Sequence, residues 1–194
     1  MPPKPKCTRN QVIDAALEIV SEKGIHALTA KELGRALNSS ATPIFTVFSS
    51  MGEVQSEVKK AAMKRFESYA HKLGSEMAVF KQVGMQMILF AKEEPNLYAL
   101  TFMSKNGNVK SFDDIYAHLG VVADECLDAI QKSYGLTLSD AKMIFEHSWV
   151  HTYGIGTLCA TGMCNLSDEE ISKMLTQDFN AIMMLLKSET GNEK

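Results

Sequence analysis

The sequence lacks any apolar run long enough to cross a membrane. Its most apolar stretch, MQMILF, is followed almost at once by Lys92, Glu93 and Glu94, whereas a transmembrane helix needs roughly 20 apolar residues. The first residues, MPPKPK, are basic and rich in proline, but no apolar core of a secretory signal follows them. We therefore expect a cytoplasmic protein that has no membrane partner.

Cysteine is scarce and scattered. The four cysteines are Cys7, Cys126, Cys159 and Cys164. They lack the paired clusters of a zinc module, and in a reducing cytosol they are expected to be free thiols. Composition thus gives no sign of a structural metal site or a disulfide framework.

Strand signals are missing as well, since no stretch of useful length alternates apolar and polar residues, and no internal repeat is present. Helix starts are plentiful. A Ser or Thr followed three residues later by Glu or Gln is typical of a capping box at a helix N-terminus. The pattern occurs at Thr8/Gln11, Thr29/Glu32, Ser50/Glu53 and Ser167/Glu170. The sequence predicts an all-α protein with about nine helices.

The helical periods locate the predicted helices. Residues 113–135 continue in one helical period until Gly135, and Pro95 interrupts the helix before it and opens the next. Glu93 and Glu94 are interpreted as a solvated helix end. The first predicted helix begins after Thr8 and ends at Gly24, a short second one begins after Thr29, and a long one runs from Ser50 to about Gly74. Further helices are predicted over residues 78–94, 95–104, 113–135 and 139–162, and the last begins at Ser167.

The uncharged stretch NSSATPIFTVF, residues 38–48, predicts a helix of about two turns. If Ser40 caps it, Pro43 falls at the third helical position, where its missing N–H has no intrahelical partner in any case. Ile44 and Phe48 lie four residues apart and are expected to pack inward. The side chains wholly or partly outward are then Ser40, Thr42, Pro43, Phe45 and Thr46.

A tight turn at Asn38 and Ser39 would join this short helix to the helix that follows Thr29. Asn tolerates a left-handed backbone better than most residues, which suits such a turn. Two short helices joined by a tight turn, with a first helix against them, form a helix-turn-helix head.

At this point the sequence resembles the tetracycline-repressor (TetR) family of bacterial transcription regulators. The resemblance runs without a gap over TRNQVIDAALEIVSEKGIHALTAKELGRALNSSATPIFTVFSSMGEV. It is looser in FAKEEPNLYALTFMS and WVHTYGIGTL. The places of the family pattern are occupied by Ala15, Ala16, Gly24, Thr29, Phe45, Phe48 and Ser50.

The resemblance implies a DNA-binding domain over residues 1–50 and an effector-binding and dimerisation domain over residues 51–194. It implies a homodimeric transcription regulator, a repressor, that binds a palindromic double-stranded operator. A small-molecule effector in the second domain modulates this binding, and no enzyme activity and no cofactor are expected. Residues 1–50 carry a net charge of +2 and the remainder −5, which fits a polyanion partner for the head. The residues expected to contact DNA are Lys4, Lys6, Arg9, Thr29, Ser40, Thr42, Pro43, Phe45 and Thr46.

In the second domain, Phe145, Trp149 and Tyr153 form an aromatic stripe at four-residue steps. This stripe is interpreted either as ordinary core or as one wall of an effector pocket, and methionines adapt well to such pockets. Gly154 and Gly156 suit a helix seam between two subunits, or are a local weakness in a buried helix. The pocket prediction comprises Met85, Met87, Phe102, Met103, His147, Trp149, His151 and Tyr153. The dimer prediction, based on the family's pairing of its last two helices, comprises Gly154, Gly156, Leu158, Leu175, Phe179, Ile182 and Leu186.

Two rival functions stay open at this stage. The family usually has Gly at Asn38, Tyr at Phe45, often His at Val47 and nearly always Lys at Met51, so an interaction protein that has lost DNA binding is one alternative. The other is a helical metalloenzyme, because His147 and His151 lie four residues apart on a predicted helix. That motif lacks the catalytic Glu after its first histidine and has no evident third ligand, so we expect no catalytic residue and no metal.

Overall fold

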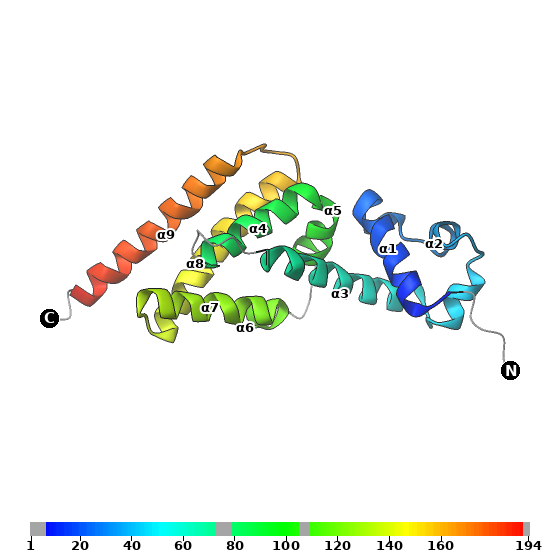
Figure 1. Ribbon diagram of the computed structural model, residues 1–194, viewed down its shortest axis with the longest axis horizontal. Coiled ribbons are helices and arrows are strands. Elements are labelled where there is room, and N and C mark those ends of the chain that lie inside the picture. Colours follow the sequence, from blue (N-terminus) through cyan, green and yellow to red (C-terminus); the bar gives the residue numbers. More distant parts are fainter. Residues whose placement is uncertain (1–6, 73–78, 105–108, 192–194) are drawn as a thin grey trace. The chain divides into compact units, whose positions relative to one another are not determined.

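The computed structural model describes residues 7–72, 79–104 and 109–191, and in these residues it is helical and contains no strand (Figure 1). The predicted all-α fold is confirmed. Two 3₁₀ segments and one π-helical segment accompany nine α-helices in the described parts. Their bounds are α1 Arg9–Lys23, η1 Ile25–Ala27, α2 Ala30–Ala36, η2 Thr42–Thr46, α3 Met51–Ala70, α4 Val79–Glu93, α5 Pro95–Tyr98, η3 Ala99–Met103, α6 Phe112–Leu119, α7 Val121–Tyr134, α8 Leu138–Ala160 and α9 Asp168–Gly191.

The chain divides into two compact units. The first unit comprises Met1–Phe66 and Glu94–Ser104, and the second comprises Glu67–Glu93 and Lys105–Lys194. The chain passes from the first unit to the second within α3 and returns to the first for α5 and η3. The functional boundary at residue 50 is a different division, and it remains a prediction. Among the described helices, none has the length and apolar character that a membrane crossing demands.

Capping hydrogen bonds explain where several helices begin. At α1 the Thr8 hydroxyl accepts from the Gln11 N–H while the Gln11 side chain accepts from the Thr8 N–H, which is the predicted capping box. Before α9, Ser167 and Glu170 make the same pair of bonds. Two further boxes use aspartate as the acid and were not in the predicted set, Ser111/Asp114 before α6 and Thr137/Asp140 before α8.

The prediction of one helix over residues 113–135 is wrong. Gly120 has φ +54°, and it separates α6 from α7. Glycine carries no Cβ and accepts this backbone readily, so the chain turns there even though the apolar period continues on both sides. Pro95 opens α5, as predicted.

The core of the first unit joins α1, α3 and α5 beneath the helix-turn-helix. Its apolar members include Val12, Ala16, Val20, Leu33, Ile44, Phe48, Val54, Val58, Phe66 and Leu97, all at most 3% exposed. The interpretation of Glu94 as solvated is wrong, because this side chain is buried. Its carboxylate accepts from the Ser21 hydroxyl at 2.6 Å and pairs with the Arg65 guanidinium at 2.5 Å. A buried carboxylate needs such partners, and these bonds join α1, α3 and the residue before α5.

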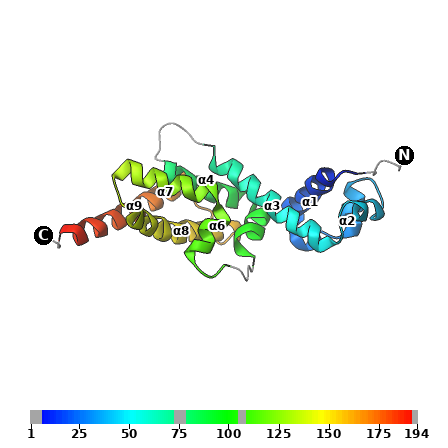
Figure 2. The same ribbon diagram turned by 90° about the horizontal axis from the view of Figure 1, so that it is seen from below.

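In the second unit α8 packs against α4, α7 and α9, and α6 packs against α7 (Figure 2). One cluster at the α4–α8–α9 junction contains Ile88, Ile155, Ile171 and Leu175, with Met85 packed against it. The arrangement leaves a space between α4, α7, α8 and α9 that becomes important below.

Candidate nucleic-acid interface and ligand cavity

The helix-turn-helix consists of α2 and η2. Thr29 caps α2, because its hydroxyl accepts from the Glu32 N–H at 3.2 Å. Asn38 has φ +50° and is the one non-glycine residue with positive φ among those described, so the predicted left-handed turn is confirmed. Ile44 is fully buried and Phe48 nearly so, so both pack inward as predicted. The turn therefore presents η2 with a fixed orientation.

Gly34 was not singled out in the sequence, yet it sets how closely α2 and the turn approach. A Cβ atom added there would lie 3.1 Å from Ser39 O, from Ser40 C and from Ala41 N. These are backbone atoms, which cannot move aside as a flexible side chain can. A glycine in the interior of a short helix, which lowers helix propensity, is the signal that would have indicated it.

The predicted Ser40 cap of the helix within residues 38–48 is wrong; the helical part is Thr42–Thr46, called the recognition segment below. The segment is one short 3₁₀ helix, Ala41 stands at its N-cap, and no side chain caps it. Pro43 consequently falls at the second helical position and Ser40 lies outside the helix. The Ile44 N–H bonds to Ala41 O and the Val47 N–H bonds to Ile44 O, both at 3.1 Å. The 3₁₀ helix is used in short pieces, and this run of five residues is already longer than most.

The recognition segment presents hydroxyl and aromatic groups to the outside. Thr42 and Thr46 are exposed, Phe45 is 46% exposed and Pro43 is half-buried. The Thr46 hydroxyl donates to Pro43 O at 2.6 Å, so it retains its lone pairs as acceptors. Ser40 and Thr29 are exposed too, although the Thr29 hydroxyl is engaged as a cap.

Arg9 bonds to the residues that directly follow the recognition segment. Its Nη1 donates to Val47 O at 3.0 Å, its Nη2 lies 2.7 Å from the Glu53 carboxylate, and its guanidinium carbon sits 4.2 Å from the centre of the Phe48 ring. The Ser49 backbone and hydroxyl, together with Arg9, lower the pKa of Glu53 to about 2, so Glu53 is ionised at neutral pH. Lys4 and Lys6 lie outside the described residues.

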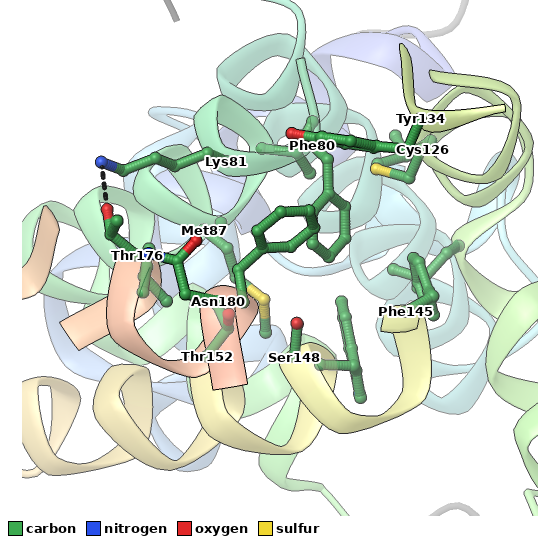
Figure 3. A pocket seen from close by; sticks show the side chains of 17 residues that line it. Phe80, Lys81, Met87, Cys126, Tyr134, Phe145, Ser148, Thr152, Thr176 and Asn180 are labelled. Atoms are coloured by element: carbon green, nitrogen blue, oxygen red, sulfur yellow. Dashed lines mark hydrogen bonds between the residues drawn. The ribbon is translucent and has the colours of Figure 1, made fainter. Parts of the chain in front are cut away.

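A cavity of about 360 Å³ lies inside the second unit (Figure 3). Five aromatic residues stand in its walls; Phe145 is stacked on Trp149 at 5.9 Å between ring centres, and the ring of Tyr134 lies 5.0 Å from that of Phe179. The size falls within the roughly 300–1,000 Å³ of small-molecule sites. Its lining comprises Phe80, Lys81, Val83, Gly84 and Met87 from α4, Leu119 at the end of α6, Val122, Cys126 and Tyr134 from α7, Phe145, Ser148, Trp149 and Thr152 from α8, and Leu175, Thr176, Phe179 and Asn180 from α9.

Of the residues predicted to bind an effector, Met87 and Trp149 line this cavity. Phe102 and Met103 belong to the first unit, where the Phe102 ring packs edge-on against Phe66, and Met85 packs against the cluster at the α4–α8–α9 junction. Tyr153 is half-buried on α8 outside the lining.

His147 and His151 line a separate, shallow pocket with Phe112, Glu146, Val150 and Asp178. His151 Nδ1 lies 3.8 Å from the Asp178 carboxylate. Within the described part of the chain, no group of three or more His, Cys, Asp or Glu residues is arranged to hold a metal ion. The histidine pair therefore gains no third ligand from the fold.

Comparison with known proteins identifies the architecture. No protein-family model matches the sequence, and no curated protein matches it either. Solved structures do match over most of their length. A TetR-family transcriptional regulator from Vibrio parahaemolyticus has a TM-score of 0.66 at 17% identity, covering 89% of this chain and 97% of that one. The chain has the TetR fold.

Two more TetR structures support this assignment. A TetR-like transcriptional regulator from Rhodococcus sp. RHA1 has a TM-score of 0.61 at 13% identity, over 92% of this chain and 96% of that one. A TetR-family regulator from Mesorhizobium loti MAFF303099 has a TM-score of 0.56 at 16% identity, over 92% and 98%. Sequence identity this low explains why the fold, and not the sequence as a whole, carries the likeness.

The residues predicted for a TetR-type dimer seam fall into two groups. Gly154 is exposed, with open space where a Cβ would stand, and Leu158 is half-buried. The others pack within their own unit: Gly156, Leu175, Ile182 and Leu186 are buried, and Phe179 and Leu175 line the cavity. Exposed apolar side chains stand near Gly154 on α8 and towards the end of α9, namely Val150, Met184 and Leu185. These four positions are called the outer α8–α9 residues below.

Proposed function

We propose that this protein is a homodimeric, DNA-binding transcription regulator of the TetR type, in which a small molecule bound in the second unit changes operator affinity. The observation that carries the proposal is the pairing of two features in one chain. A helix-turn-helix exposes Thr42, Phe45 and Thr46, and a separate unit contains an apolar cavity of about 360 Å³. The TetR fold supports both assignments.

The recognition segment is proposed to read DNA mainly through apolar contact and shape. Thr42 and Thr46 offer hydroxyls, and Phe45 offers a ring that suits sugars and thymine methyl groups. Within this segment no Arg, Asn or Gln is present for a bidentate base contact. Backbone affinity is then proposed to come from Lys4, Lys6 and Arg9, and Arg9 also holds the segment through Val47 O.

The dimer is proposed to form through the outer α8–α9 residues. Val150 is 61% exposed and Met184 72% exposed, and Gly154, four residues after Val150 on α8, has open space where a Cβ would stand. Large exposed apolar side chains gathered on one face are typical of interaction surfaces. Val150→Asp is expected to shift the protein from dimer to monomer in sedimentation experiments. Val121→Asp on α7, where the valine is also 61% exposed, is the matched control and should stay dimeric.

The experiment that tests the function is a gel shift against the DNA upstream of the protein's own gene. We expect wild-type protein to retard one site, and Thr42→Ala/Thr46→Ala to relax preference among site variants by about 1–3 kcal/mol for each lost base contact. Thr161→Ala, an exposed threonine at the end of α8, is the control.

A second candidate function, an interaction protein without DNA binding, rests on Phe45, Val47 and Met51, where the family has polar or charged groups. Complete absence of retardation at low salt would favour it. Met51→Lys distinguishes the two, because a cation at the start of α3 should tighten a real DNA complex without changing its specificity.

A further inference from the structure

The polar groups around the cavity are few and uneven. Lys81 is the only charged side chain among the described lining residues, and none of them carries a carboxylate. Its ammonium donates to the hydroxyls of Ser172 and Thr176 at 2.8 Å each, which places it at the α4–α9 side (Figure 3). A cationic ligand would therefore meet a like charge and find no anion to pair with.

Ser148 is the second unusual group. It lies in the middle of α8, it is only 6% exposed, and its hydroxyl oxygen is buried without a hydrogen-bond partner. A serine inside a helix usually points to solvent or bonds the carbonyl four residues earlier, and Ser148 does neither. Figure 3 shows its oxygen directed towards the interior of the cavity, near Thr152. A buried hydroxyl left unpaired lowers stability, so a ligand oxygen that reached Ser148 Oγ would recover a hydrogen bond that the described chain does not supply.

We propose that the cavity takes a neutral, largely apolar molecule with a hydroxyl or carbonyl group, that this group hydrogen-bonds Ser148 Oγ, and that organic cations are rejected. The proposal deepens the proposed function and rests on it, since it names the chemical class of the effector. Ser148 supplies both a donor and an acceptor, so either oxygen group can pair with it. Rings and aliphatic side chains supply the rest of the binding surface.

The remaining wall is electrically neutral, which agrees with a neutral ligand. Cys126 lines the cavity, and burial raises the pKa of its thiol to about 12, so it is uncharged at neutral pH. A charged ligand group placed beside Ser148 would lose its hydration shell and gain only one hydrogen bond, to the Ser148 hydroxyl. A neutral oxygen loses far less, because one good hydrogen bond replaces the one it made to water.

The test uses three ligands with the same ring body: 1-naphthol, naphthalene and 1-naphthylmethylammonium. Their dissociation constants are measured by equilibrium dialysis against the full-length wild type, Ser148→Ala and Ser139→Ala. Ser139 is an exposed serine on the same helix, so its variant is the matched control. In wild type and Ser139→Ala, naphthol should bind about tenfold tighter than naphthalene, the equivalent of one net hydrogen bond. In Ser148→Ala this advantage should disappear, and the ammonium compound should bind weakest to every variant.

A second variant tests, independently of Ser148→Ala, whether the three ligands bind in this cavity. A Cβ at position 84 would stand 3.4 Å from Leu175 Cδ1 and 3.5 Å from Thr152 Oγ1, which are ordinary contacts. Gly84→Ala should therefore narrow the cavity and weaken all three ligands while the preference for naphthol persists. Equal affinity for naphthol and naphthalene in wild type, a naphthol advantage that survives in Ser148→Ala, tightest binding by the ammonium compound, or no binding of any of the three would each overturn the proposal.

The gel shift described above is run on the same preparations. If naphthol shows the Ser148-dependent advantage but the protein never retards DNA, the proposed function fails while the ligand class stands. If DNA is retarded and the Ser148 dependence is absent, the ligand class fails and the proposed function stands.

Discussion

The helix-turn-helix and the cavity are built on opposite principles. The first is a short run of chain, residues 29–48, whose shape depends on backbone constraints at Gly34 and Asn38. The second is assembled from α4, α6, α7, α8 and α9, and its shape depends on side chains with space left between them. An added methyl group should therefore destabilise the helix-turn-helix, whereas the cavity should accommodate it. Substitutions paired across the two regions test this difference.

The largest expected effect comes from removing a core side chain of the recognition segment. Ile44 is fully buried, and Ile44→Ala should lower the free energy of unfolding of the first unit by about 2–5 kcal/mol. DNA retention in a gel shift should be lost, while ligand dialysis at the cavity should be unchanged. Ile130→Ala, an equally buried isoleucine of α7 in the second unit, is the reciprocal control. Loss of ligand binding in Ile44→Ala as large as in Ile130→Ala would mean that the two regions are not independently stabilised.

The next effect compares one substitution at two glycines. Gly34→Ala pushes a Cβ against three backbone atoms at 3.1 Å and should lower stability by about 1–3 kcal/mol through overpacking. Gly84→Ala meets side chains at normal contact distances, and alanine's better helix propensity should offset most of its cost, leaving stability within about 1 kcal/mol of wild type. Urea unfolding followed by circular dichroism measures both. Equal destabilisation by the two variants would contradict the difference in their surroundings.

The same contrast explains what the sequence could predict. The capping boxes at helix starts depend on two residues three apart, so the sequence predicts those of Thr8/Gln11 and Ser167/Glu170. It also predicts the left-handed turn at Asn38, because that turn depends on the residue type at one position. The break at Gly120 and the 3₁₀ winding of Thr42–Thr46 were missed, because each depends on neighbours that the apolar period does not report.

The cavity was only partly predictable for a related reason. Met87 and Trp149 were named because apolar and aromatic residues recur at helical spacing. Phe102 and Met103 are of the same apolar and aromatic kinds, but they belong to the first unit and not to the unit that contains the cavity. Ser148 gives no signal in the sequence, since only the packed helices show that its hydroxyl is buried without a partner.

Asn38 allows a smaller test of the backbone constraint. The left-handed backbone region costs about 1–2 kcal/mol for a residue that has a Cβ and no compensating polar side chain. Asn38→Ala should therefore lower the free energy of unfolding by about 1 kcal/mol. Asn38→Gly should be near neutral, because glycine adopts φ +50° freely but loses more entropy on folding. Thermal unfolding of both variants beside wild type gives the ranking. If Asn38→Ala matched or exceeded Asn38→Gly in stability, the turn would not be under the constraint inferred here.

The smallest effect concerns acid sensitivity at two similar helix starts, one in each unit. The Ser49 N–H and hydroxyl, with Arg9, lower the pKa of Glu53 from 4.5 to about 2. The Ser167 N–H and hydroxyl lower the pKa of Glu170 without an arginine. A carboxylate whose pKa is lowered in the folded state stabilises that state above its ordinary pKa, and the contribution disappears as pH falls through the folded value.

Glu53→Gln should therefore reduce the urea midpoint most at neutral pH, and its difference from wild type should shrink between about pH 4.5 and pH 2. Glu170→Gln should show the same sign and a smaller difference, since no cation among the described residues does for Glu170 what Arg9 does for Glu53, and both carboxylates are exposed to solvent screening. Adding 1 M NaCl should reduce the Glu53 difference more than the Glu170 difference, because only the Arg9 contribution is an ion pair. A Glu53→Gln difference that stays constant from pH 7 to pH 2 would show that the amide acts through packing at the start of α3, and that the charge between Arg9 and Glu53 does not help to hold the recognition segment in place.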